Sequence, residues 1–164
     1  MRLPAFIIRR LRIWAHRTIR KRKPDFVIRP ADHDYLRRWW VIPRNPFFNI
    51  YLHEILVSDD DRALHDHPWI NASILLQGEY IEHTIDAGGI HCRRRRKAGD
   101  VVLRSPWAAQ RLVVPGIEAD LCLALFITGP RLRDWGFHCP DAGWRHWRDF
   151  TGEDKGSIGR GCGE

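Results

Sequence analysis

The stretch from residue 26 onward constrains the fold most, because short runs of β-forming residues alternate there with turn residues. Residues that favour turns separate the runs, as at 86–89 and 129–130. Many short strands at this spacing indicate a sandwich or a small barrel rather than alternating βαβ units. We therefore predict an all-β domain with strands at 49–56, 69–76, 80–85, 90–95, 100–104, 110–114, 121–128 and 135–138.

Residues 1–24 have a different pattern, which predicts a basic amphipathic helix that Pro24 ends. Ile7, Leu11 and Trp14 follow helical spacing, and arginines fill much of the remaining surface. Two interpretations stay open. The helix docks its apolar stripe on the domain, which we favour, or it is an adhesive arm for a membrane surface, a nucleic acid or an acidic partner. Residues 25–150 then form the barrel domain, and residues 151–164, rich in Gly and charge, form a flexible tail.

The positive charge of the chain is local. Of the 27 Lys and Arg residues, nine lie in residues 1–23, which contain no acidic residue, so the net charge of +7 leaves −2 for the rest. The body therefore gives no general reason to expect a nucleic-acid or membrane role.

Cysteine use indicates the compartment. Cys92, Cys122, Cys139 and Cys162 form no C-x-x-C pair, which argues against a structural zinc site. Four scattered thiols fit a reducing cytoplasm better than a disulfide framework. The apolar stretch at 3–8 is too short for an export signal, and no window reaches the ~20 apolar residues of a membrane span. We expect a cytoplasmic protein.

The segment His65-Asp66-His67 is the feature most indicative of chemistry. Side chains alternate along an extended chain, so His65 and His67 project to the same face and Asp66 to the other. Two imidazoles that converge in this way suit Fe(II), Mn(II), Ni(II) or Zn(II). Asp66 is expected to make a hydrogen bond at the surface or in a turn, and His53, His83 and His138 are further candidates for the same interior.

The spacing around these histidines resembles the cupin superfamily, whose RmlC-like jelly roll is a double-stranded β-helix. Its first motif is G-x5-H-x-H-x3,4-E-x6-G, which His65, His67 and Gly78 match, and Gly99 begins the second, G-x5-P-x-G-x2-H-x3-N. The resemblance covers about residues 49–138. It implies a small single-domain cupin with a metal and a small-molecule ligand inside the barrel, and homodimers formed through the sheets.

Four positions depart from the cupin motifs. Asn71 stands at the usual glutamate, Ser105 at the proline, Trp107 at the glycine and Gln110 at the third histidine. An amide oxygen is a weaker donor than imidazole or carboxylate, so the metal site is degenerate, either weakened or lost. The expected metal ligands are His65, His67 and Gln110, and the expected substrate contacts include Asn71, Trp69 and Trp107, which adjoin them.

The run from Arg93 to Arg96 also has two interpretations. It forms an edge strand that charge protects from pairing with other sheets, or alternate guanidinium groups line the barrel mouth and clamp an anion, with Arg95 as the candidate. The sequence thus leaves three functions open: a metal-dependent cupin oxygenase or isomerase, a non-catalytic module that binds a small anionic molecule, and a scaffold. Contact with a membrane or nucleic acid through residues 1–23 is not favoured.

Overall fold

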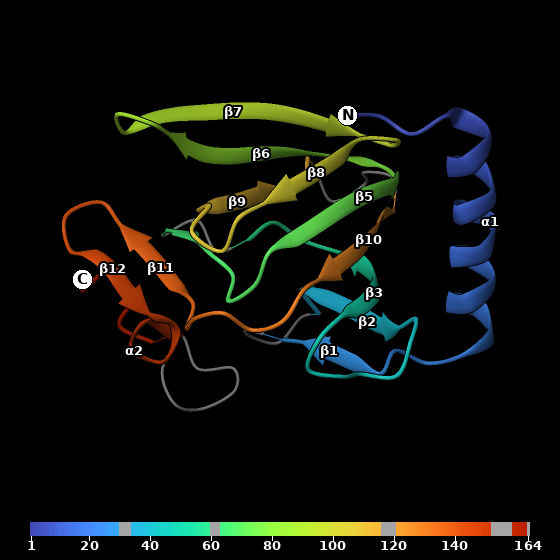
Figure 1. The fold of residues 1–164 in the computed structure, drawn as a ribbon, viewed down its shortest axis with the longest axis horizontal. Helices are drawn as coiled ribbons and strands as arrows, with labels where there is room; N and C mark the ends of the chain where they lie inside the picture. The colour runs from blue at the N-terminus through green and yellow to red at the C-terminus, as the bar shows by residue number, and fades with distance from the viewer. Residues whose placement is uncertain (30–33, 60–62, 116–120, 152–158, 164) are drawn as a thin grey trace.

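The computed structural model describes residues 1–29, 34–59, 63–115, 121–151 and 159–163, which form two helices and twelve strands (Figure 1). In chain order these elements are α1 (Ala5–Lys21), β1 (Phe26–Ile28), β2 (Leu36–Trp40), β3 (Asn49–Ile55), β4 (Leu64–His65), β5 (Asn71–Gln77), β6 (Glu79–Asp86), β7 (Ile90–Lys97), β8 (Val101–Arg104), β9 (Gln110–Val113), β10 (Cys122–Thr128), β11 (Gly136–Cys139), β12 (Gly143–His146) and α2 (Trp147–Thr151).

The strands build two six-stranded antiparallel sheets. The first has the order β1-β2-β3-β10-β5-β8 and the second β12-β11-β4-β9-β6-β7. Between them lies an apolar cluster that includes Leu36, Ile55, Leu75, Tyr80 and Ala124. The all-β prediction is confirmed, and each of the eight expected strands is present with its ends shifted by a few residues. The arginine-rich β7 is the outermost strand of the second sheet, as the edge-strand interpretation predicts.

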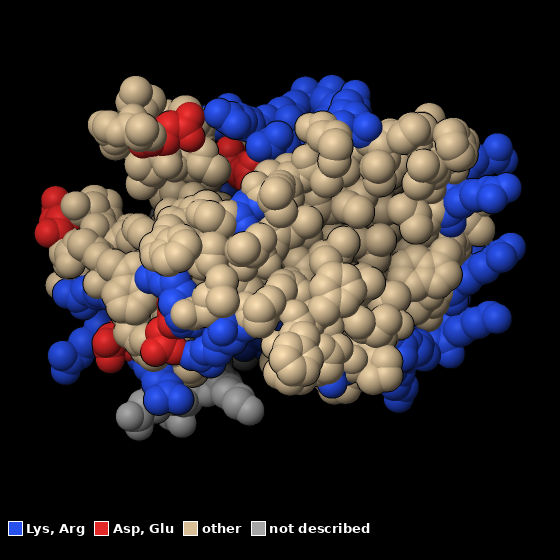
Figure 2. Space-filling view, viewed as in Figure 1, with Lys and Arg blue, Asp and Glu red and all other residues tan. Residues whose placement is uncertain are grey.

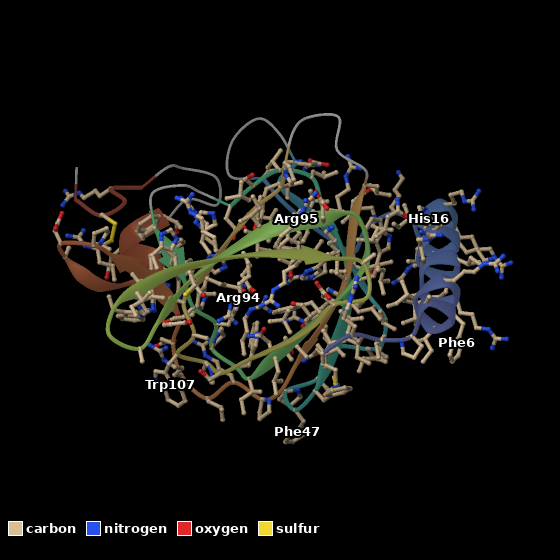
Figure 3. All side chains as sticks on the ribbon, turned by 90° about the horizontal axis from the view of Figure 1, so that it is seen from above. Phe6, His16, Phe47, Arg94, Arg95 and Trp107 are labelled. Atoms are coloured by element: carbon tan, nitrogen blue, oxygen red, sulfur yellow. A yellow bond between two sulfur atoms is a disulfide. The ribbon has the colours of Figure 1, made fainter. Side chains whose placement is uncertain are left out.

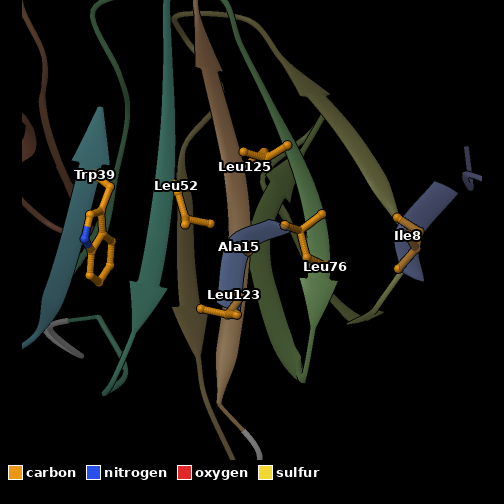
Figure 4. Close-up of a cluster of buried hydrophobic side chains, with 7 residues drawn as sticks. All are labelled: Ile8, Ala15, Trp39, Leu52, Leu76, Leu123 and Leu125. Atoms are coloured by element: carbon orange, nitrogen blue, oxygen red, sulfur yellow. The ribbon is translucent and has the colours of Figure 1, made fainter. Parts of the chain in front are cut away.

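Helix α1 packs across the outer face of the first sheet, at one end of the molecule (Figure 1). Ile8 and Ala15 are buried against Leu52, Leu123 and other side chains of that face (Figure 4). The ring of His16 is 2.7 Å from the side-chain oxygen of Gln77 at the end of β5. Each large apolar side chain buried in this way contributes about 1.5–3 kcal/mol. The helix is thus docked on the domain, the first of the two interpretations given for it.

The C-terminal segment corrects the expectation for the cysteines. Cys139 on β11 forms a disulfide with Cys162, and Cys92 and Cys122 are free. Spacing alone missed this pair because the two residues are 23 positions apart and meet only after β12 and α2 fold back. Phe150 of α2 is fully buried and stacks on Phe137, with ring centroids 3.7 Å apart. Most of the predicted flexible tail, 152–158 and 164, lies outside the described residues.

Candidate functional site

The space between the sheets divides into an apolar and a polar half. Alternation places His53 on the same face of β3 as Ile55, Asn71 on the same face of β5 as Leu75, and Gln110 two residues before Leu112 on β9. Ile55 and Leu75 belong to the apolar cluster, and Leu112 packs against it, so the three polar residues face the same interior one step further along their strands. All three are buried.

His65 and His67 lie side by side where β4 ends. Their ring centroids are 5.2 Å apart and their planes are nearly perpendicular, at 89°. The ring of Trp69 is stacked parallel to His67 at 6.4 Å, and Phe126 from β10 contacts His67 at 5.4 Å. The spacing of one residue therefore brings the two imidazoles together.

Gln110 is in direct contact with this pair. Its backbone pairs with His65 across β4 and β9, and its side-chain amide nitrogen donates a hydrogen bond to Nε2 of His67 over 2.9 Å. Because the amide can only donate there, Nε2 of His67 carries a lone pair and its proton is on Nδ1. Burial lowers the pKa of His67 well below its usual value, and the charges of His65 and Arg104 lower it further. His67 is thus a neutral imidazole with an occupied Nε2.

His53 joins the group from the opposite sheet, as one of the three further histidines considered from the sequence. Its ring stacks on Phe126 at 5.2 Å, and its Nε2 accepts a hydrogen bond of 2.8 Å from Nε of Arg38. Burial lowers the pKa of His53 well below its usual value, and the positive charge of Arg38 acts in the same direction. His53 is therefore also a neutral acceptor whose Nε2 is occupied.

Arg38 is the residue that the sequence reasoning missed. It lies on β2, directly opposite His53, and its guanidinium stands 4.8 Å from the centre of the Tyr51 ring. Burial lowers the pKa of Arg38. None of the carboxylates in the described residues pairs with it. Alternation could have placed its side chain on the interior face, because Arg38 is two residues from the buried Leu36.

Three polar atoms in this group have no hydrogen-bond partner. They are Nε1 of Trp69, Oδ1 of Asn71 and Oε1 of Gln110, all shielded from solvent. Leaving such an atom unsatisfied costs about 1–3 kcal/mol. We call Arg38, His53, His65, His67, Trp69, Asn71 and Gln110 the interior polar group. Arg38, His65, His67 and Trp69 are half-buried, whereas Asn71 and Gln110 lie deep.

A second set of interior charges is already paired. The carboxylate of Glu82 on β6 is buried and accepts hydrogen bonds from Nε of Arg104 over 2.8 Å and from Nε of Arg96 over 2.7 Å. Arg104 also donates to the hydroxyl of Ser73 over 3.0 Å. Because Arg96 and Arg104 are already paired with Glu82, their guanidinium groups have less capacity to bind a ligand than that of Arg38.

Two of the expected contacts lie outside the interior polar group. Arg95 is exposed on β7, where its guanidinium pairs with Glu79. Trp107 is 66% exposed and points away from the body of the molecule (Figure 3), with the guanidinium of Arg133 5.9 Å from its ring. The interior cations come instead from β2, β7 and β8.

Asp66 requires a correction as well. It points away from the two imidazoles, as alternation predicts, but it is fully buried rather than at the surface. Its carboxylate accepts hydrogen bonds from four groups: the Gly136 backbone N–H, Arg133, Trp144 and His138. His138 therefore belongs to this network, and His83 lies beside His91 with 3.0 Å between their ring nitrogens.

The donor set of the interior does not fit a divalent metal. His53 and His67 already accept hydrogen bonds from Arg38 and Gln110, and the guanidinium of Arg104 lies near enough to lower the pKa of His67. Within the described ranges, no three His, Cys, Asp or Glu side chains form a cluster able to hold a metal ion. A dication beside His67 would meet these cations, and the carboxylate next to His65, Asp59 at 3.9 Å from its Nδ1, already accepts hydrogen bonds from Tyr35 and the Leu112 N–H.

Comparison with known proteins identifies the fold. No protein-family model and no curated protein matches the sequence. Solved structures do match, among them oxalate decarboxylase of Bacillus subtilis, an enzyme with Mn(II) centres, at a TM-score of 0.51 and 14% identity over 71% of this chain and 30% of that one. A Klebsiella pneumoniae protein with a double-stranded β-helix domain matches at a TM-score of 0.49 and 16% identity, over 68% of this chain and 90% of that one.

With its two antiparallel sheets and the match at a TM-score of 0.51, the chain has a cupin-type fold, the double-stranded β-helix, which is the fold that the sequence resemblance implied. It spans less than a third of the oxalate decarboxylase chain, and at 14% identity the likeness establishes the fold alone. No helix in the described part of the chain is long and apolar enough to cross a membrane.

Proposed function

We propose that this protein binds a small anionic molecule in the polar half of its barrel and holds no resident metal there. The observation that carries the proposal is Arg38, a guanidinium on the interior face of β2 that pairs with no carboxylate of the described residues. An arginine in such surroundings favours a carboxylate or a phosphate, which its planar fork can bind through two hydrogen bonds. Arg44 lies close enough to act on Arg38 electrostatically, which adds to the positive potential.

The unsatisfied atoms define the rest of the ligand. Nε1 of Trp69 can donate to an oxygen, and the amide oxygens of Asn71 and Gln110 can accept from a hydroxyl or an amino group. A ligand that carries an acidic group and a hydroxyl or amine would therefore satisfy both Arg38 and the deeper amides. Binding would remove the cost of leaving these polar atoms without partners.

The hydrogen bonds of His53 and His67 favour a binding role over a role as general base for these two residues. A general base needs a free lone pair within reach of the proton that it removes. Nε2 of His53 already accepts from Arg38, and Nε2 of His67 already accepts from Gln110. The two neutral imidazoles are thus held as parts of the binding surface. We place the protein with the non-catalytic cupin-type modules rather than with the oxygenases or isomerases.

Calorimetric titration tests this proposal with acetate, succinate and inorganic phosphate as probes. We expect at least one probe to bind, and Arg38→Gln to weaken it by about 10- to 100-fold, the loss of one charge-assisted contact. Arg95→Gln is the matched control, because it removes the same charge outside the interior polar group. Failure of all three probes, or equal binding by both variants, would contradict the proposal.

Metal analysis separates the two main candidates. The adjacency of His65 and His67 is the observation that favours a metal-dependent enzyme. Protein purified without added metal should contain far less than one metal ion per chain. Near-stoichiometric iron, manganese, nickel or zinc that disappears in His65→Ala would instead support the enzyme. The homodimer stays a prediction, which light scattering of the purified protein tests.

A further inference from the structure

The solvent-facing side of α1 combines positive charge with exposed apolar side chains. Figure 2 shows a row of Lys and Arg side chains along the edge formed by α1, with no acidic side chain visible there. Arg9, Arg10, Arg17 and Arg20 are exposed on this side, which we call the basic face. None of the four forms an ion pair with a described carboxylate, and the one side-chain bond among them runs from Arg20 to the backbone of His16.

Two large apolar residues lie in the middle of the basic face. Phe6 is 67% exposed and Ile13 is 42% exposed. They are seven residues apart and therefore project from the same side of the helix, with Arg9 and Arg10 between them and Arg17 one turn beyond. Figure 3 shows Phe6 on α1 directed away from the sheets. An apolar centre with flanking arginines is typical of helices that lie in a membrane interface.

Two clefts beside the C-terminal end of α1 are also lined by basic residues. One, of about 370 Å³, is lined by Arg20, Lys21, Arg22, Lys23 and Arg37, with Trp39 at its wall. Its single carboxylate, Glu54, is already bonded to Arg37. The neighbouring cleft, of about 290 Å³, shares Lys21 and Arg22 and is lined by Trp14, Trp40 and Val41. Cations beside tryptophan rings suit an anionic headgroup at the boundary between water and lipid.

We propose that the basic face of α1 docks this protein on an anionic lipid surface. The helix stays on the domain, because Ile8 and Ala15 are buried against the first sheet, so docking requires no unfolding. Phe6 and Ile13 enter the headgroup layer while the surrounding arginines contact phosphates and carboxylates. Helix α1 contains no acidic residue, whereas the rest of the chain, residues 24–164, carries a net charge of −2.

The exposed apolar pair favours lipid over nucleic acid. A phosphate backbone would satisfy the arginines but would leave Phe6 and Ile13 facing a polar, hydrated partner. A bilayer accommodates both kinds of side chain at once. The two partners therefore respond differently to a change that removes only the apolar side chains.

Vesicle cosedimentation of the full chain tests the proposal, with phosphatidylcholine vesicles that contain or lack phosphatidylserine. The unaltered protein should bind the vesicles that contain phosphatidylserine, and high salt should release it from them. Each basic residue near an anionic surface strengthens binding about fivefold, so R9Q/R10Q/R17Q should bind on the order of 100-fold more weakly. The matched control is R93Q/R94Q/R95Q on β7, which removes the same charge elsewhere and should bind nearly as the unaltered protein does.

A second variant, F6S/I13S, keeps every charge and should weaken vesicle binding at least tenfold. Circular dichroism checks that each variant is folded. Equal binding to neutral vesicles, no binding to anionic vesicles, or equal losses in the two arginine variants would overturn the proposal. Displacement by RNA, with F6S/I13S unchanged in its RNA affinity, would assign the face to nucleic acid instead.

Discussion

Replacement of Asp66 by Asn would test the network that supports the two imidazoles from the opposite side of the chain. The carboxylate is fully buried. Its Oδ1 accepts from the Gly136 N–H over 2.9 Å, and its Oδ2 accepts from Arg133 over 2.9 Å, Trp144 over 2.9 Å and His138 over 3.0 Å. Asp66→Asn removes the negative charge and turns one accepting oxygen into a donor, so at least one of these bonds is lost.

The expected cost follows from these partners. Removing one member of a buried ion pair costs about 3–5 kcal/mol, here because Arg133 keeps its charge without a carboxylate. For a chain of this size each kcal/mol lowers Tm by about 2–4 °C, so Asp66→Asn should melt roughly 6–20 °C lower. The matched control is Asp134→Asn, which breaks the exposed pair with Arg131 and should cost less than about 1 kcal/mol.

The same carboxyl should make stability depend on pH in acid. Burial alone would raise the pKa of Asp66, but the hydrogen bonds from His138, Gly136 and Trp144 and the charge of Arg133 lower it below its ordinary value. A pKa lower in the folded than in the unfolded state stabilises the protein above the unfolded pKa, about 3.9, and the effect is lost as pH falls through the folded pKa. Thermal melts of both variants across pH would refute the reasoning if Asp66→Asn matched Asp134→Asn at pH 7, or if its deficit persisted undiminished in strong acid.

Three further predictions concern the helix, the disulfide and the histidines. Ile8→Ala should cost about 2–5 kcal/mol in chemical denaturation because Ile8 is buried under α1, whereas the exposed Ile13→Ala should cost much less; equal small losses would show that α1 is not docked. Cys162→Ser should lower the free energy of unfolding by about 2–4 kcal/mol and make the melting temperature insensitive to reductant. An unaltered free energy of unfolding would show that the Cys139–Cys162 disulfide does not stabilise the fold. The pKa values of His53 and His67 are lowered in the folded state, so the free energy of unfolding should decrease below about pH 6.5, where the unfolded chain takes up protons first. His53→Phe should make this decrease with falling pH less steep, and an unchanged pH dependence would argue against a buried neutral ring at position 53.

The sequence predicted the strands whose pattern is local. The strands β3, β5 and β10 have apolar runs bounded by turn residues, and the ends of the expected ranges 49–56, 69–76 and 121–128 lie within two residues of the observed ends. Period-two spacing also placed His65 and His67 side by side. These features depend on neighbours in the chain, which is why they can be read without a structure.

The features that the sequence did not predict depend on distant partners. Strand β2 has the sequence Leu-Arg-Arg-Trp-Trp, and its two charged residues do not fit the apolar pattern by which strands are predicted. In the structure the two arginines face opposite sides of the strand: Arg37 contacts Asp34 and Glu54, and Arg38 contacts His53. Asp66 was expected at the surface because nothing nearby in the chain could bury it; its partners lie about 70 residues away. A polar residue is buried only where partners satisfy it, and the order of the sequence does not show those partners.

The residue at position 110 decides which chemistry this barrel can support. A histidine there would offer a third imidazole lone pair to a metal. The Gln110 amide instead donates a hydrogen bond to Nε2 of His67, and this bond occupies the lone pair that a metal would need. The guanidinium of Arg38 acts in the same direction, since it would repel a bound dication and would stabilise an anion. The amide at position 110 and the guanidinium at position 38 are both consistent with the anion-binding barrel that we propose. Reversing one of them is therefore informative: Gln110→His alone should gain little affinity for Mn(II) or Zn(II), and Q110H/R38Q should gain more than the sum of the single variants in calorimetric titration. Strong metal binding by Gln110→His with Arg38 intact would show that the interior charge does not govern the site.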